Sequence, residues 1–405
     1  MKIVQVEFDR DKVIGQWQGM GGAITEAAAY NYLKLPEKRR KVFLDAYYSK
    51  AGLGYNWGRV AVGSCDFSLT EHEYKLARDK KYILPMLQDI LARKDLRLIA
   101  SPWSPPAYMK TNLQLREGGR LRKKYFEDYA KFLRKWLDDY AEEGVKVDYL
   151  VPQNEPAAAQ KWESCKWSLR AQRKFIYDYL APALAGTETK ILGWDHNKKH
   201  LARVARFLLA HAPQATSDKV AGLAFHWYDG AHTKQMDKVR ARYEDKLLIS
   251  SEMCCGWSEY DEKKWKNDAD LYAGEIFACI NSGVTAWLDW NILLDAHGGP
   301  AQQDNQVKAP IILNEKKNDF ILTPIYKRLY EIAHSIPVDC EILRCESDGV
   351  RTAVGRPRGV MAVATKKNDD PRVVIVNLGN EDAEIRINGK KAFQLAAREL
   401  KSIKI

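Results

Sequence analysis

The sequence has few of the features that mark metalloproteins, disulfide-bonded proteins or membrane proteins. Its seven cysteines are an odd number without any CxxC spacing, which argues against a metal cluster and a complete disulfide framework. No apolar run is long enough to span a bilayer, and the opening residues alternate in polarity rather than forming a signal peptide. We therefore expect a cytoplasmic protein, or a secreted one if a signal segment has been removed.

Nucleotide- and nucleic-acid-binding signatures are also missing. No GxGxxG follows a predicted strand, and no nucleic-acid-binding motif is present. The net charge is +11, but the basic residues are scattered among acids. A solvated surface explains this pattern best, with attraction to acidic cell-surface material as the alternative. We expect no cofactor, metal or nucleic-acid partner, and the sequence does not set the oligomeric state.

Aromatic residues and a regular strand–helix alternation are what the sequence does contain. The 405 residues include 12 Trp and 20 Tyr, enough for a large core and for flat apolar faces of the kind that bind sugars. Eight short apolar runs alternate with helix-period segments, which favours an α/β fold of the (β/α)8 barrel type over an open doubly wound sheet. The predicted strands are Gln18–Gly22, Tyr55–Val62, Arg97–Pro102, Val147–Gln153, Lys190–Trp194, Val220–His226, Lys246–Glu252 and Val284–Trp290. The predicted helices include Pro36–Ser49, Tyr125–Glu143, Ser168–Leu184, Leu201–Ala212 and Leu271–Ile280.

After about residue 322 the pattern changes to short alternating strands. A last helix is predicted at Ile325–Ile336, and turn signals separate the strands that follow it. The strand at Lys2–Phe8 has the same alternation, so we expect it to join this small β domain. The predicted domains are a barrel at 12–322 and a side domain formed by 1–11 together with 323–405. The predicted side-domain strands are Gly359–Thr365, Arg372–Leu378, Ala383–Ile387 and Leu400–Ile405.

Two glutamates stand at the ends of predicted barrel strands. Glu155, in Gln153-Asn154-Glu155-Pro156, follows the fourth strand, and Glu252 ends the seventh. Function in such barrels is located at the carboxyl ends of the strands, so both carboxylates should meet at one mouth. Breaking a glycosidic bond needs two carboxyl groups, one acid for the leaving oxygen and one carboxylate for the sugar carbon. The proline restricts the backbone of Glu155, and an acid at this position needs a pKa raised by burial and a neighbouring carboxylate.

Other polar and aromatic residues follow the same strand ends. Arg59 lies inside an apolar strand, where it would hold Glu252 ionised or form a purely structural ion pair. Asp66 and Trp103 could bind sugar hydroxyls, or could be a turn cap and a core indole. His226 or Tyr228 could hydrogen-bond Glu252, and Tyr228 is preferred. Trp290 could lie beneath the sugar ring, and Cys254 could line the site.

These segments together resemble glycoside hydrolase family 30, in its branch of glucosylceramidase-like β-glucosidases. Each match is weak alone, but their order and spacing over residues 18 to about 311 are specific. The segments that carry it are Gly19–Ala29, Leu53–Asn56 with Arg59, Ser64–Ser68, Ala100–Pro106, Met109–Asn112, Gln153–Ala157, Phe225–Tyr228, Ser251-Glu252, Asp289–Asn291 and Gly298–Pro300.

The resemblance implies a barrel with a β-sandwich side domain and retaining hydrolysis of β-linked sugars. It assigns Glu155 as acid/base and Glu252 as nucleophile. It places Arg59, Asp66, Trp103, Asn154 and Trp290 around the transferred sugar.

One position departs from the family. Where relatives commonly have an asparagine after Gly-Gly-Pro, this chain has Ala301, and Asp295 or Asn305 could replace that contact. The sequence therefore predicts a retaining β-glycosidase acting on a β-linked glycoside or oligosaccharide. A β-glucosidase is favoured over a β-1,6-glucanase, β-xylosidase or β-fucosidase. A transglycosylase and an inactive carbohydrate-binding protein are the remaining alternatives.

Overall fold

The computed structural model describes residues 2–353 and 356–405. Met1 and residues 354–355, which belong to the predicted side domain, lie outside the described residues. Eight parallel strands close into a barrel because the first, β2, pairs with both β3 and the last, β9. This closure confirms the (β/α)8 prediction and excludes the open sheet. The strands are β2 (Gly19–Ala23), β3 (Trp57–Val62), β4 (Arg97–Pro102), β5 (Tyr149–Leu150), β6 (Lys190–Asn197), β7 (Val220–His226), β8 (Leu247–Glu252) and β9 (Ala286–Asp289).

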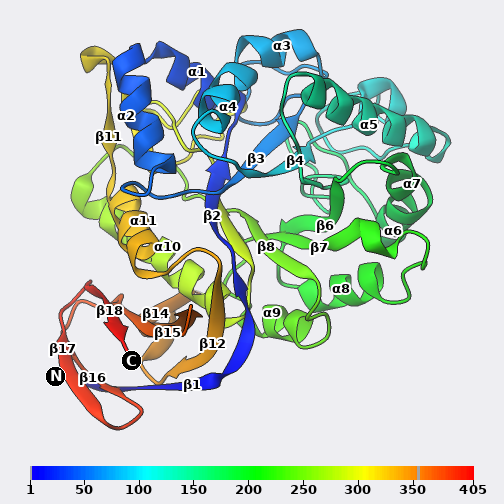
Figure 1. The fold of residues 1–405 in the computed structure, drawn as a ribbon. Coiled ribbons are helices and arrows are strands. Elements are labelled where there is room, and N and C mark those ends of the chain that lie inside the picture. The colour runs from blue at the N-terminus through cyan, green and yellow to red at the C-terminus, as the bar shows by residue number, and fades with distance from the viewer. Residues whose placement is uncertain (1, 354–355) are drawn as a thin grey trace.

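Helices surround the barrel, as Figure 1 shows. Their apolar faces follow the helical period: α5 buries Phe126, Tyr129, Leu133 and Tyr140 in the main hydrophobic core. The helices are α1 (Glu26–Lys34), α2 (Glu37–Tyr48), α3 (Leu76–Lys81), α4 (Ile83–Leu91), α5 (Phe126–Glu142), α6 (Leu169–Phe175), α7 (Ala181–Ala183), α8 (Leu201–Leu209), α9 (Thr233–Arg240), α10 (Glu262–Asn281) and α11 (Pro324–Ser335). None of the described helices is both long and apolar enough to cross a membrane.

The side domain is one hydrogen-bonded sheet that buries a core of its own. Its strand order is β17-β16-β1-β12-β14-β15-β18, with β13 attached to β14, and a single cluster of apolar residues draws on the strands from both ends of this order. Figure 1 shows the domain beneath the barrel, with both chain termini in it. The strands are β1 (Lys2–Trp17), β12 (Cys340–Ser347), β13 (Val350–Ala353), β14 (Arg356–Lys367), β15 (Asp370–Asn377), β16 (Ala383–Ile387), β17 (Lys391–Leu395) and β18 (Leu400–Lys404).

The opening strand is longer than the sequence indicated. β1 pairs in parallel with β16 and then antiparallel with β12 as far as Trp17, which lies opposite Cys340. The strand thus continues past residue 11, where the predicted domain boundary lies, although its pairing with β12 is irregular between Asp9 and Val13, and it leads directly into the barrel. A short hairpin, β10 (Ile311–Asn314) with β11 (Asp319–Leu322), precedes α11.

Two predicted elements are shorter or more irregular than expected. The fourth barrel strand, predicted at Val147–Gln153, is reduced to the two residues of β5. Pro152 has no backbone N–H, so the strand cannot continue its ladder there. The helix predicted at Ser168–Leu184 contains a π-helical turn at Ile176–Leu180, just before Pro182. A proline inside a helix removes a hydrogen bond and crowds the preceding turn, which accounts for this irregularity.

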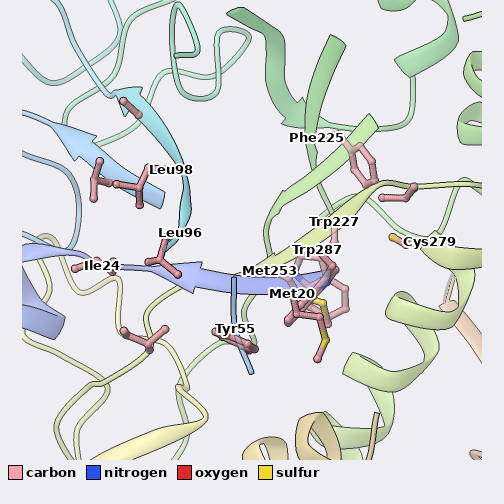
Figure 2. Packing of buried hydrophobic residues seen from close by; sticks show 14 of the residues in the cluster. Met20, Ile24, Tyr55, Leu96, Leu98, Phe225, Trp227, Met253, Cys279 and Trp287 are labelled. Carbon is pink, nitrogen blue, oxygen red and sulfur yellow. The ribbon is translucent and has the colours of Figure 1, made fainter. Parts of the chain in front are cut away.

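Buried aromatic and aliphatic side chains fill the space between the strands and the helices. Figure 2 shows part of this packing, where Met20, Trp227, Met253 and Trp287 lie close together. All seven cysteines are buried and none forms a disulfide. Trp227 and Met253 directly follow the barrel strands β7 and β8, so the core supports the strand ends from which functional side chains project.

Candidate active site

Two β-bulges direct polar side chains to the same point. In a regular strand Ser251 and Glu252 would point to opposite faces. Between β7 and β8, however, Phe225 pairs with Ser250 while His226 pairs with Glu252, so Ser251 is an extra residue. The Ser251 hydroxyl donates to Asp195 at 2.6 Å, and the Glu252 carboxylate joins the same network. A second bulge, at Trp194 and His196 in β6, surrounds Asp195, whose φ is +59°.

Arg59 on β3 is the centre of this network. Its side chain is completely buried and donates to Glu252 Oε2, to Asp195 Oδ2 at 2.8 Å and to the amide oxygen of Asn154 at 2.8 Å. A fourth bond joins its Nε to Ser101 Oγ at 3.0 Å. A buried guanidinium with two carboxylate partners stays charged and fixes both. The structure thus places Arg59 against Glu252, as the sequence predicted, and adds Asp195.

Glu252 ends β8 with its carboxylate held by two donors. Besides Arg59, the Tyr228 hydroxyl donates to Glu252 Oε1 at 2.7 Å. The Tyr228 oxygen also lies 3.2 Å from the Cys254 sulfur. Burial raises the pKa of Tyr228, as do its neighbours Cys254 and Glu252, so the phenol remains a neutral donor. These two bonds fix the position of the Glu252 carboxylate.

His226 contacts a different carboxylate from the one predicted. Its Nδ1 lies 3.2 Å from Glu155 Oε1 and 3.7 Å from Glu252 Oε1, so Glu155 is its hydrogen-bond partner. Its Nε2 lies 3.2 Å from Asp195 Oδ1. Burial by itself lowers the pKa of His226, but the charges of Glu252, Asp195 and Glu155 outweigh it and raise the pKa to about 10. The imidazole is therefore a cation among three carboxylates.

Glu155 has an unusual backbone and an ionised carboxylate. Its φ is +45°, a left-handed conformation that is rare for a residue with a side chain and costs about 1–3 kcal/mol, so the fold must hold it in place. The Gln160 amide donates to Glu155 Oε2 at 3.1 Å, and His196 Nδ1 lies 3.5 Å from Oε1. Burial raises the pKa of Glu155, but the bonds from His196 and His226 lower it well below its usual range. The expectation that this carboxyl has a raised pKa in the free protein was therefore wrong, because two imidazoles contact it.

Aromatic rings form an apolar surface beside these charges. Trp103 and Trp290 stack with ring centroids 5.2 Å apart, and the Arg59 guanidinium lies 4.9 Å from the first ring and 5.2 Å from the second. Both tryptophans belong to one buried cluster with Cys254, and Ala301 packs against that cluster. The cluster gives the network of carboxylates an apolar wall of the kind on which a sugar ring can lie.

Asp66 and Asn305 meet at the edge of this wall. Asn305 Nδ2 donates to Asp66 Oδ2 at 2.7 Å, whereas Asp66 Oδ1 is buried without a partner among the described residues. Burial raises the pKa of Asp66, as do the charges of Glu252, Glu163 and Glu155. Asp295 instead caps the turn before the Gly-Gly-Pro segment, through the backbone N–H of Gly299 at 2.9 Å. Of the two residues suggested as replacements for the missing asparagine, Asn305 is the one that reaches this region.

Sequence reasoning missed several residues that complete the site. Asp195 stands at the end of the fifth barrel strand, where the strand-end rule could have found it, but the predicted strand stopped one residue earlier. Ser251 stood in the segment Ser251-Glu252 that carries the family resemblance, but no role was predicted for it, and no sequence signal marked the remaining residues. The missed residues are Gln160, Glu163, Asp195, His196, Ser251 and Gln302. No group of three or more His, Cys, Asp or Glu side chains in the described part of the chain could hold a metal ion.

Comparison with known proteins gives the family. Residues 17–336 match the domain described as the glycosyl hydrolase family 30 TIM-barrel domain. The chain belongs to glycosyl hydrolase family 30. The lysosomal acid glucosylceramidase of Mus musculus is 29% identical over 418 residues, covering 93% of this chain and 78% of the mouse protein. This confirms the glucosylceramidase-like branch and a glycoside hydrolase.

Two solved structures share the complete architecture. SrfJ from Salmonella typhimurium is 28% identical with a TM-score of 0.89, covering 99% of this chain and 92% of SrfJ. The endo-beta1,6-glucanase BT3312 is 25% identical with a TM-score of 0.83, covering 98% of this chain and 93% of BT3312. The barrel and the side domain are thus both part of a shared architecture.

Proposed function

We propose that this family 30 hydrolase is a retaining β-glucosidase of the glucosylceramidase type, with Glu252 as nucleophile and Glu155 as acid/base. One observation carries the proposal: both carboxylates face the same His226 nitrogen, at 3.2 Å and 3.7 Å. Their Oε1 atoms therefore lie at most about 7 Å apart. This upper limit is compatible with the carboxylate separation of about 5–5.5 Å in enzymes that form a covalent glycosyl-enzyme.

The surroundings of the two carboxylates suit different tasks. Glu252, held by Arg59 and Tyr228, is oriented to attack the anomeric carbon while the bond to the leaving oxygen breaks. Glu155 supplies the proton that the leaving oxygen needs. Water then attacks the glycosyl-enzyme, loses a proton to Glu155 and releases the sugar from Glu252 with retained configuration.

Three further predicted residues have groups that can contact the sugar, two through hydrogen bonds and one through an apolar ring. The Asn154 amide oxygen is occupied by Arg59, which leaves its NH₂ group for the 2-hydroxyl. Asp66 Oδ1 has an unused acceptor for another hydroxyl. Trp290, which stacks on Trp103, supplies an apolar face.

The test is Glu252→Gly. We expect it to lose essentially all hydrolysis of aryl β-glucosides, and to recover turnover with azide, which enters the vacated space and forms a glycosyl azide of inverted configuration. Glu155→Ala is the companion variant, and its loss should be largest for poor leaving groups. Unchanged turnover in Glu252→Gly would eliminate the assignment.

The second candidate is a β-1,6-glucanase, which the likeness to an endo-beta1,6-glucanase over nearly the full chain favours. The same carboxylates would act, and only the subsites beyond the cleaved bond would differ. A panel of aryl β-glucoside, β-xyloside and β-fucoside together with a β-1,6-glucan separates these specificities. Release of oligosaccharides from the glucan, with little cleavage of the aryl glucoside, would select the glucanase. Transfer products formed at high acceptor concentration would show transglycosylation.

A further inference from the structure

His226 lies at the meeting point of charged and titratable groups from four barrel strands. Asp195 and His196 come from β6, Glu252 from β8, and Glu155 follows β5. Arg59 on β3 binds both Glu252 and Asp195. The Tyr228 ring stands edge-on to the imidazole at 6.0 Å.

The charges of this cluster balance best when His226 is protonated. Three carboxylates, those of Glu155, Asp195 and Glu252, face only one permanent cation, Arg59, among the residues that the structure describes. A neutral imidazole would leave two uncompensated negative charges in a site with almost no solvent exposure, which is costly. Both ring nitrogens have a carboxylate oxygen within hydrogen-bond distance, as an imidazolium with two N–H donors requires.

This arrangement changes where the catalytic proton is stored. An acid/base residue must hold a proton when the glycosidic bond begins to break. Glu155 accepts hydrogen bonds from Gln160 and His226, contacts that favour its ionised form. The resting enzyme would therefore have the proton on the imidazole rather than on the carboxyl.

We propose that His226 stores the proton that Glu155 delivers to the leaving group, and that Asp195 positions the imidazole for this transfer. The proposal rests on the proposed function, because it assumes that Glu155 acts as the acid. As the glycosidic C–O bond breaks, the leaving oxygen takes a proton from Glu155, which takes the Nδ1 proton of His226. The imidazole becomes neutral, with its Nε2 proton still bonded to Asp195. In the second step the proton lost by water returns through Glu155 to Nδ1, so the cycle balances.

A stored proton has a measurable consequence at alkaline pH. An isolated glutamic acid would lose its proton near its ordinary pKa, or somewhat above it when buried, and general-acid catalysis would end there. The pair formed by Glu155 and His226 keeps one proton to a higher pH, because three carboxylates stabilise the imidazolium. Removing the imidazole should therefore move the alkaline limb of kcat/KM to lower pH, by about 2 units.

His226→Asn tests this, because its side-chain amide can still donate to Glu155 but cannot store a proton. The substrates are phenyl β-glucoside, whose leaving group needs an acid, and 2,4-dinitrophenyl β-glucoside, whose leaving group needs almost none. At pH 8 we expect kcat/KM for the phenyl glucoside to fall about 30-fold more than for the dinitrophenyl glucoside, and this gap to narrow toward pH 5. Asp195→Asn should shift the alkaline limb in the same direction by a smaller amount.

Equal losses on both substrates at every pH would mean that His226 is only structural, and an unmoved alkaline limb would overturn the proposal. A second measurement works without a variant: ¹⁵N NMR of histidine-labelled wild-type enzyme should show one imidazolium that persists at pH 8. A spectrum in which all eight histidines are neutral at that pH would also overturn it. If instead the wild-type enzyme cleaves no β-glycoside, the proposed function itself fails, whatever the state of His226.

Discussion

Replacing Arg59 by methionine should both destabilise and inactivate the protein. The completely buried side chain makes four hydrogen bonds, to Glu252, Asp195, Asn154 and Ser101. Methionine fills similar space but removes the charge, leaving two carboxylates in the interior without their main cation. Removing one member of a buried ion pair costs about 3–5 kcal/mol, a large part of the roughly 5–15 kcal/mol by which a domain is stable.

The loss of stability should depend on pH in a defined direction. Burial raises the pKa of Asp195, but the charge of Arg59 and the contact with His226 outweigh it and hold the pKa below its ordinary range. The ionised Asp195 of the wild-type protein therefore stabilises the fold above the unfolded pKa of about 3.9, and this contribution disappears as pH falls through the folded value. In Arg59→Met the carboxyl is no longer held ionised by that charge. The difference in unfolding free energy from wild type should be largest at pH 7 and shrink only as pH falls below the folded pKa of Asp195 in the variant, by about 1.4 kcal/mol for each pKa unit between that pKa and the lower one of the wild type.

Urea unfolding at a series of pH values from 7 to 2.5, followed by tryptophan fluorescence, measures this difference. The control is Arg97→Met on the neighbouring strand, because the Arg97 side chain is 39% exposed and lies 3.6 Å from Asp339. A surface pair of this kind contributes at most about 1 kcal/mol. Equal losses for the two variants, or a loss for Arg59→Met that does not change with pH, would refute the account of Arg59 as the charge that holds Asp195 ionised.

Two further predictions concern the surroundings of the site. Asn305→Ala removes the 2.7 Å bond to Asp66 and should lower kcat/KM for aryl β-glucosides up to about tenfold, mainly through KM, since one such hydrogen bond contributes about 0.5–1.5 kcal/mol. An unchanged KM would show that Asp66 needs no such support. Arg356→Met removes a guanidinium 3.4 Å from the centre of the Trp227 ring, and thermal unfolding should show a stability loss of about 1–2 kcal/mol. Because Trp227 lies between His226 and Tyr228, kcat should fall as well, and an unaffected kcat would mean that the side domain contributes only stability.

The barrel and its two glutamates could be predicted because local patterns encode them. Strands such as Val220–His226 are short apolar runs, and helices such as Phe126–Glu142 repeat their apolar residues every three or four positions. Glu155 and Glu252 then followed from one rule, that function is located where barrel strands end. The family resemblance added the order of the motifs and pointed to the same two residues.

Other parts of the fold had weaker local signals. The strands Cys340–Ser347 and Lys391–Leu395 were not predicted, and β1 continues to Trp17 well past the alternation that marked its beginning. Each of these strands is stabilised by partners distant in sequence, such as the pairing of β1 with β12. Long-range pairing of this kind overrides local preference in sheets.

The sequence by itself thus determined where the eight barrel strands lie and which two carboxylates reach the mouth of the barrel. Only the tertiary structure decided what these carboxylates contact: the bulges that bring Ser251 and Asp195 into the network, the pairing of His226 with Glu155, and the bond from Asn305 to Asp66. The physical reason is that apolar periodicity is a property of neighbouring residues, whereas charge compensation depends on which side chains meet after the barrel has closed.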